Sequence, residues 1–323
     1  MSCKLVFLLL LGMFVVPLQW AQTSEQLRAP HTQSRPADLQ SDEAVPTIRA
    51  SVEEVNVIFT ATDKKGRFKK DLTPNELAVF DDGKPPAAVR SFRSETDLPL
   101  RAGLVFDVSG SITDRFTFEQ EAAIRFFHQI VRPRTDQAFV LAFHSVPTVT
   151  QDFTDNLGRL AEGVRKFTPG GGSAVYDAIH LAATRKLMAL RADRPVRRII
   201  ILISDGEDNQ SRLTRAQVID AARRAEVTIY AISTNSSNSV SRGDKLMEKL
   251  AEETGGRVFF PRKIEDVVEA LRRIEDELRS QYALSYKPAD FDADGRYRRI
   301  EIQSRTDKNL VIRARKGYFA PHP

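Results

Sequence analysis

The stretch AGLVFDVSGS, residues 102–111, decides the fold and points to the function. Its first half is an apolar run, which is typical of a strand buried on both faces of a sheet. Its second half places one carboxylate and two hydroxyls at alternate positions: Asp107, Ser109 and Ser111. Clustered oxygen ligands suit the hard cations Mg²⁺, Mn²⁺ and Ca²⁺. The stretch therefore predicts a buried strand that ends in a metal-binding loop.

Two further loops carry oxygen ligands in similar places. Residues 170–173, GGGS, open a predicted helix, and the apolar run 199–203 leads into Ser204-Asp205-Gly206. Taken singly, such loops are typical of ordinary turns and helix caps. Here the segments between them alternate strand and helix, so the loops should meet where parallel strands end.

Together these loops resemble the metal-ion-dependent adhesion site (MIDAS) of von Willebrand factor type A domains. The segments 173–179 (SAVYDAI), 80–85 (FDDGKP) and 313–319 (RARKGYF) resemble a group of secreted bacterial proteins in which β-rich segments flank such a domain. The resemblance covers nearly all of the chain after about residue 48. One departure is Ser173, where the family usually has threonine. The hydroxyl is kept, but the β-branch that stiffens χ1 is lost.

The resemblance implies a set of five metal ligands: Asp107, Ser109, Ser111, Ser173 and Asp205. In the family the hydroxyls contact the metal directly, and the aspartates hold it mainly through water. A cation with neutral direct ligands stays electropositive and keeps one position open for an acidic side chain of a partner protein. We therefore expect Mg²⁺, or Mn²⁺ or Ca²⁺, as the cofactor, and a partner that offers Asp or Glu.

The expected fold is α/β, with a doubly wound, mainly parallel, Rossmann-like sheet formed by residues 97–280. Residues 49–96 and 281–323 instead alternate apolar and polar side chains with period two, which favours half-buried strands. Each of these flanking segments has too few strands to be stable alone. We therefore expect them to pair into one small β-sandwich-like module, with the type A domain inserted between them.

Within the central domain, periodicity predicts the order of strands and helices. The predicted strands cover residues 102–106, 138–143, 148–153, 199–203, 227–232 and 257–260, and the predicted helices cover residues 116–130, 156–167, 173–190, 214–226, 245–254 and 264–280. The last helix carries an apolar stripe that includes Val267, Val268 and Leu271 and is expected to face the core. The resemblance also implies that this helix can shift when a ligand binds.

The N-terminal region has the features of an exported protein. Lys4, an apolar stretch and the small residue Ala21 predict a signal peptide over residues 1–21. An uncleaved anchor is the alternative, because Gln19 occupies a place usually held by a small residue. Residues 22–48 are polar and proline-containing and predict a disordered tether. We expect a secreted or periplasmic protein with no transmembrane domain in the mature chain.

Composition narrows the functional classes. The net charge of +5 is mild for 323 residues and, together with the export signal, argues against nucleic-acid binding. Cys3, within the predicted signal peptide, is the only cysteine, so the mature chain can form no disulfide. A contact between the basic residues of the tail, around residues 296–299 and 313–316, and an anionic envelope polymer is a further alternative.

Two other functions stay open at this point. The first is a structural envelope scaffold whose metal site is not essential. The second is a metal-dependent hydrolase, which needs a general base near metal-bound water. His144 is the single plausible base, and the sequence has no Gly-x-Ser-x-Gly nucleophile motif. We therefore expect a binding protein and not an enzyme.

Overall fold

The structure is a computed structural model that describes residues 54–94, 98–110, 116–190, 192, 195–235, 237 and 239–322. The described residues from 54 onward belong to one compact unit. The predicted signal peptide, the predicted tether and the predicted ligand Ser111 lie outside the described residues.

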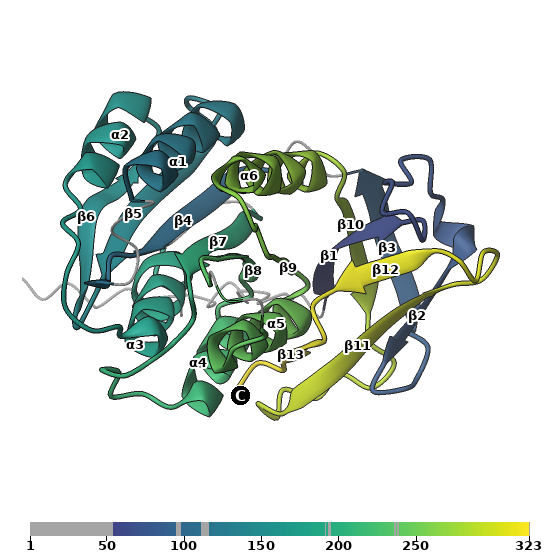
Figure 1. Ribbon diagram of the computed structural model, residues 1–323. Coiled ribbons are helices and arrows are strands. Elements are labelled where there is room, and N and C mark those ends of the chain that lie inside the picture. Colours follow the sequence, from purple (N-terminus) through teal and green to yellow (C-terminus); the bar gives the residue numbers. More distant parts are fainter. Residues whose placement is uncertain are drawn as a thin grey trace, which may run out of the picture. The chain divides into compact units, whose positions relative to one another are not determined.

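A six-stranded sheet forms the centre of the α/β domain (Figure 1). Its strand order is β6-β5-β4-β7-β8-β9, and every pair of neighbours is parallel except β5 and β6. The strands are β4 (Leu100–Asp107), β5 (Gln137–Phe143), β6 (Pro147–Thr154), β7 (Arg197–Ser204), β8 (Thr228–Ser233) and β9 (Arg257–Phe259). The doubly wound, mainly parallel fold predicted from the sequence is confirmed.

Helices cover both faces of this sheet (Figure 1). One face packs against α1 (Phe116–Ile130), α2 (Leu157–Arg165) and α6 (Ile264–Leu278). The other packs against α3 (Val175–His180), its π-helical continuation η3 (Leu181–Met188), α4 (Arg215–Arg224) and α5 (Arg242–Thr254). Because both faces are covered, the central strands can be apolar throughout, as residues 102–106 and 199–203 are.

The structure adds one detail to the predicted helices and corrects another. The segment predicted as a helix over residues 173–190 is helical, but it changes to π-helical hydrogen bonding at Leu181. Within it the Thr184 hydroxyl donates to the His180 carbonyl oxygen, a contact that competes with the backbone ladder. In α6, Val267 is buried but Val268 is 40% exposed. Adjacent helical residues point about 100° apart, so both cannot face the same core.

The flanking segments form a β-sandwich-like module of two antiparallel sheets. One sheet has the order β12-β1-β10-β3 and the other β13-β11-β2. The strands are β1 (Val55–Thr62), β2 (Leu77–Asp81), β3 (Ala88–Ser94), β10 (Tyr282–Lys287), β11 (Tyr297–Ser304), β12 (Val311–Ala314) and β13 (Gly317–Phe319), and the short 3₁₀ helix η1 (Pro74–Glu76) precedes β2.

The pairing of N-terminal with C-terminal segments in this module agrees with the predicted fold class. Strand β10 lies between β1 and β3, and β11 pairs with β2. The rings of Phe59 and Tyr282 stack in the shared core, with 5.4 Å between their centroids. The domain boundaries themselves, after residues 96 and 280, stay a prediction.

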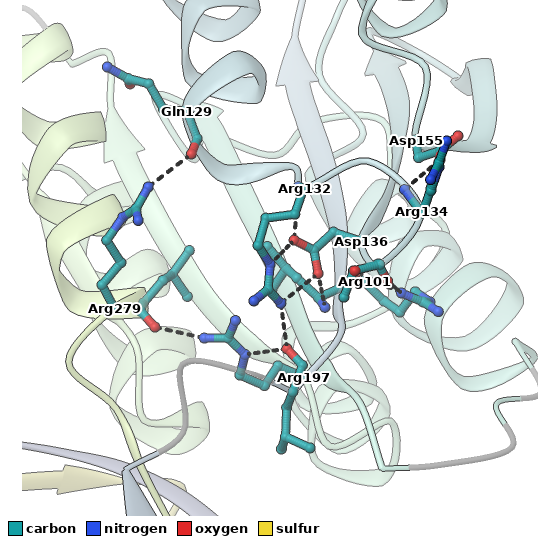
Figure 2. A network of polar contacts seen from close by, with 12 residues as sticks. Arg101, Gln129, Arg132, Arg134, Asp136, Asp155, Arg197 and Arg279 are labelled. Carbon is teal, nitrogen blue, oxygen red and sulfur yellow. Dashed lines mark hydrogen bonds and ion pairs between the residues drawn. The ribbon is translucent and has the colours of Figure 1, made fainter.

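A polar network lies at the amino ends of the parallel strands (Figure 2). The Asp136 carboxylate accepts hydrogen bonds from Arg132 Nε at 2.8 Å, from Arg132 Nη2 at 3.0 Å and from the Leu100 amide at 2.7 Å. Arg132 Nη2 and Arg197 Nε both donate to the Leu98 carbonyl oxygen. The buried carboxylate at this end of the sheet thus has its own cationic partner.

Candidate metal site

Three loops meet at the carboxyl ends of the parallel strands, as predicted. Asp107 ends β4, and Asp205 follows the last residue of the neighbouring strand β7, so the two lie on strands about 4.8 Å apart. The glycine loop is joined to the same edge, because Gly170 N–H donates to the Val108 carbonyl oxygen at 2.7 Å. Ala174 N–H donates to the carbonyl oxygen of His144, directly after β5, at 2.8 Å.

Asp107 is the centre of a buried hydrogen-bond cluster. Its side chain is 1% exposed. Its Oδ1 accepts from the Ser109 amide at 2.9 Å. Its Oδ2 accepts from the Ser204 hydroxyl at 2.7 Å and from the Ser173 hydroxyl at 3.3 Å. One backbone amide and two hydroxyls, from three separate segments of the chain, therefore converge on one carboxylate.

Hydrogen bonds compensate the burial of this carboxylate only in part. Burial raises the pKa of Asp107, hydrogen bonds from Ser204 and Ser109 offset only part of this effect, and the nearby Asp205 carboxylate raises the pKa further. Among the described residues, no lysine, arginine or histidine forms an ion pair with Asp107. A buried carboxylate is costly without a cationic partner, and a bound divalent cation would supply one.

Ser173 is held in place by the loop that follows Asp205. Its amide donates to Asn209 Oδ1 at 2.9 Å, and its carbonyl oxygen accepts from the Asn209 and Gln210 amides, each at 3.0 Å. Gly171 precedes it with φ of +78°, a left-handed conformation that favours glycine. The position of one predicted ligand thus depends on the loop that carries another.

The donor chemistry of the edge fits a hard divalent cation. Among the described residues, no group of three or more His, Cys, Asp or Glu side chains is arranged to hold a metal. A metal here would therefore depend on serine hydroxyls as well as on Asp107 and Asp205. Hydroxyl and carboxylate oxygens suit Mg²⁺, Mn²⁺ or Ca²⁺.

The two acidic residues after Gly206 have structural partners. Glu207 Oε1 accepts from the Gly243 amide at 3.1 Å. Asp208 Oδ1 accepts from the Ser211 hydroxyl at 2.6 Å and from the Tyr176 amide at 3.4 Å. These contacts tie the Asp205 loop to its neighbours on both sides.

Of the five predicted ligands, the structure places Asp107, Ser109, Ser173 and Asp205 at this one edge, and Ser111 lies outside the described residues. Sequence reasoning missed Ser204 and Asn209. A signal for Ser204 was available, because Asp107 and Ser204 directly follow the two apolar runs, residues 102–106 and 199–203, that were predicted as strands. The role of Asn209 depends on how its loop folds back, and no sequence pattern indicates that.

A family comparison decides the identity of the central domain. The sequence model of the von Willebrand factor type A domain matches residues 103–273, more than half of the chain. The chain belongs to this family. A comparison with curated proteins finds no match.

Solved structures share the type A fold. A von Willebrand factor type A protein from Catenulispora acidiphila has a TM-score of 0.50 at 12% identity, with 84% of this chain and 74% of that chain covered. Proximal thread matrix protein 1 from the mussel byssus, solved with a zinc-occupied MIDAS motif, has a TM-score of 0.50 at 16% identity. That match covers 62% of this chain and 50% of the mussel protein, so the present chain spans about half of its length.

Proposed function

We propose that this type A domain protein captures an acidic side chain of a protein partner through a divalent cation. The cation would be held by Asp107, Ser109, Ser111, Ser173 and Asp205. The observation that carries the proposal is the buried Asp107 carboxylate, which receives hydroxyl and amide donors and, from the part of the chain that the structure describes, no basic side chain. The family membership supports it independently.

Each part of the edge has a role in this proposal. The bound cation supplies an electropositive point with room for one further oxygen ligand. The hydroxyls of Ser109, Ser111 and Ser173 contribute oxygens without adding negative charge, so the attraction for a partner's carboxylate is kept. Asp107 holds the hydroxyls of Ser173 and Ser204 in place by accepting a hydrogen bond from each. Mg²⁺ is the proposed ion, and Mn²⁺ or Ca²⁺ would suit the same donors.

The proposed setting is the periplasm or the cell exterior. It rests on the signal peptide predicted over residues 1–21 and the tether predicted over residues 22–48. Every helix in the described part of the chain is too short or too polar to cross a bilayer. A tethered type A domain between residues 97 and 280 would present its metal edge to partners in that compartment.

The proposal is for a binding protein and not for an enzyme. The nearest candidate base, His144, uses Nδ1 to accept the Ser145 amide at 2.7 Å. That contact favours a role in shaping the loop beside Gly171, where a Cβ atom would lie 3.3 Å from His144 Nδ1. The matched proteins named above are described as type A or byssus matrix proteins, which agrees with a non-catalytic role.

The basic tail offers less free surface than its composition indicates. Arg298 is buried and donates to the Asp290 and Asp292 carbonyl oxygens. Arg313 forms an ion pair with Glu277, and Arg315 forms one with Glu226. These arginines stabilise the fold, which makes a contact between this tail and an anionic envelope polymer a secondary proposal.

A pull-down tests the proposed function. Tagged protein covering residues 22–323 would be incubated with envelope and secreted extract in Mg²⁺, in chelator, and as the variant Asp107→Ala. We expect a partner band with wild type in Mg²⁺ alone. The control variant Asp71→Ala removes an 85% exposed aspartate of the β-module and should retain the band. A partner that Asp107→Ala still captures would overturn the proposal.

A further inference from the structure

We infer that Gly243, in the first turn of α5, is a positioning residue that fixes the distance of Asp205 from the metal. The inference rests on the proposed metal site. Gly243 touches no predicted ligand oxygen itself. It acts through backbone contact with the loop Asp205-Gly206-Glu207.

The two backbones lie in direct contact at this point. A Cβ atom on Gly243 would lie 2.1 Å from the Asp205 carbonyl oxygen, 2.4 Å from the Gly206 carbonyl carbon and 2.7 Å from the Glu207 nitrogen. All three atoms belong to backbone, which cannot rotate away as a flexible side chain does. Any residue larger than glycine at position 243 must therefore displace the Asp205 loop or α5.

Gly206, in the Asp205 loop, is equally close to the backbone of Gly243. Gly206 has φ of +72°, and a Cβ atom there would lie 2.6 Å from the Gly243 carbonyl oxygen. One hydrogen bond also joins the two segments, because the Gly243 amide donates to Glu207 Oε1 at 3.1 Å. The Glu207 amide in turn donates to Asp205 Oδ1 at 3.0 Å. A short chain of contacts thus leads from Gly243 to the carboxylate of the predicted ligand.

The first turn of α5 is itself fixed to the sheet. The buried Asp244 accepts from the Ser233 hydroxyl, at the end of β8, at 2.7 Å. Its other oxygen accepts from Asn235 Nδ2 at 2.7 Å and from the Ser241 amide at 2.9 Å. Because α5 cannot retreat easily, a side chain at position 243 should move the Asp205 loop instead.

Such a movement has a distinctive effect on metal choice. Mg²⁺ requires near-ideal octahedral geometry with ligands at about 2.0–2.1 Å, whereas Ca²⁺ accepts irregular geometry at about 2.3–2.6 Å. A displaced Asp205 loop should therefore weaken Mg²⁺ binding more than Ca²⁺ binding, whether the carboxylate meets the ion directly or through water. A general loss of stability would instead affect both ions alike.

The test compares two glycine-to-alanine variants by titration calorimetry of the protein covering residues 22–323 with MgCl₂ and with CaCl₂. Gly158 is the matched control, because it also occupies the second position of a helix, and a Cβ there meets one atom, Asn156 Oδ1, at 3.2 Å. We expect Gly243→Ala to raise the Kd for Mg²⁺ about tenfold, the size of effect seen when residues supporting metal ligands are changed, and the Kd for Ca²⁺ less. Gly158→Ala should leave the ratio of the two Kd values unchanged.

A second pair of variants keeps the test decisive if Gly243→Ala fails to fold. Glu207→Ala removes the acceptor for the Gly243 amide, and Glu207→Gln keeps an oxygen acceptor while removing the same charge. We expect the alanine variant to raise the Kd ratio of Mg²⁺ to Ca²⁺ and the glutamine variant to restore most of the wild-type ratio.

The outcomes separate this inference from the proposed function. Wild-type protein that binds neither of these ions, nor Mn²⁺, would overturn both. Wild-type binding together with unchanged selectivity in Gly243→Ala, or with equal ratios in the two Glu207 variants, would overturn the positioning role alone.

Discussion

Two buried aspartates at opposite ends of the same sheet have pKa values that are shifted in opposite directions. Asp107 and Asp136 are each 1% exposed. Burial pushes the pKa of Asp136 upward, but hydrogen bonds from Arg132 and from backbone amides outweigh it, so that pKa is lowered. Asp107 receives hydroxyls and an amide instead, and its pKa is raised. The amino end of the sheet is thus neutralised within the protein, whereas at the carboxyl end the proposed cation would supply the positive charge.

The largest expected effect comes from removing the carboxylate at the amino end. Asp136→Ala leaves the Leu100 amide and the Arg132 guanidinium without their acceptor. Hydrogen bonds to charged groups contribute about 1.5–3 kcal/mol, so we expect the free energy of unfolding to fall by about 2–3 kcal/mol. Thermal unfolding should show Tm lower by about 4–5 °C for a chain of this size. Asp136→Ala should still show an increase in Tm on adding Mg²⁺. Loss of that increase would mean that the amino end of the sheet affects metal binding at the carboxyl end.

The next effect concerns Ser173 at the carboxyl end. Asn209→Ala removes the acceptor for the Ser173 amide, and we expect the Mg²⁺ Kd to rise about tenfold, as for other residues that support metal ligands. Asn209→Asp keeps an acceptor oxygen at the same place and should bind Mg²⁺ nearly as well as wild type. Calorimetric titration measures both. Equal affinity in Asn209→Ala and wild type would show that the glycine loop holds Ser173 unaided.

A smaller effect of opposite sign is expected at Asp107. Asp107→Asn removes a buried charge while keeping hydrogen-bonding capacity, so in chelator we expect stability to rise by about 1 kcal/mol at neutral pH. The Tm increase caused by Mg²⁺ should disappear in the same variant. Thermal unfolding with and without Mg²⁺ measures both quantities. A destabilised variant in chelator would show that Asp107 stabilises the fold without metal.

The smallest effect is the shape of the pH dependence in chelator. The folded pKa of Asp136 is lowered, so its contribution to stability is present above its unfolded pKa of about 3.9 and is lost as pH falls through the folded value. The folded pKa of Asp107 is raised, so its contribution is present below about 3.9 and is lost as pH rises through the folded value.

Urea unfolding between pH 3 and pH 7 checks these signs. Relative to wild type, Asp107→Asn should gain stability as pH rises above about 4. Asp136→Asn should show its full deficit above about pH 4 and a smaller deficit as pH falls toward about 3. Parallel curves for the two variants would contradict the contrast between the two ends.

Much of this arrangement could be predicted from the sequence. Apolar runs that lead into Asp107 and into Ser204-Asp205 indicated parallel strands whose ends carry the predicted ligands, and the two strands are neighbours. Period-two alternation in the flanking segments indicated the β-module. These signals are local, and local patterns determine strands and helices reliably when they are long and regular.

Other features depended on tertiary contacts. Val268 belongs to an apolar stripe by spacing but faces solvent, because α6 presents Val267 to the core. Asn209 supports Ser173 across 36 residues of sequence, and Gly243 contacts a loop that precedes it by a similar distance. No local sequence pattern predicts these contacts between distant loops, because they depend on how the loops pack after the strands are assembled.

The strand pairing of the β-module also has a consequence for the order of folding during synthesis. Strand β1 leaves the ribosome long before its partner β10. The hydrogen bond from the Leu72 amide to the Tyr282 hydroxyl likewise forms only after a residue 210 positions later has been synthesised. The type A domain between them has its own core and can fold first, whereas β1 and β3 stay without their main partner until β10 emerges. A chain that ends after α6 would therefore carry open strand edges, which promote aggregation. Folding of the β-module is thus completed only when the C-terminal strands pair with the strands synthesised first.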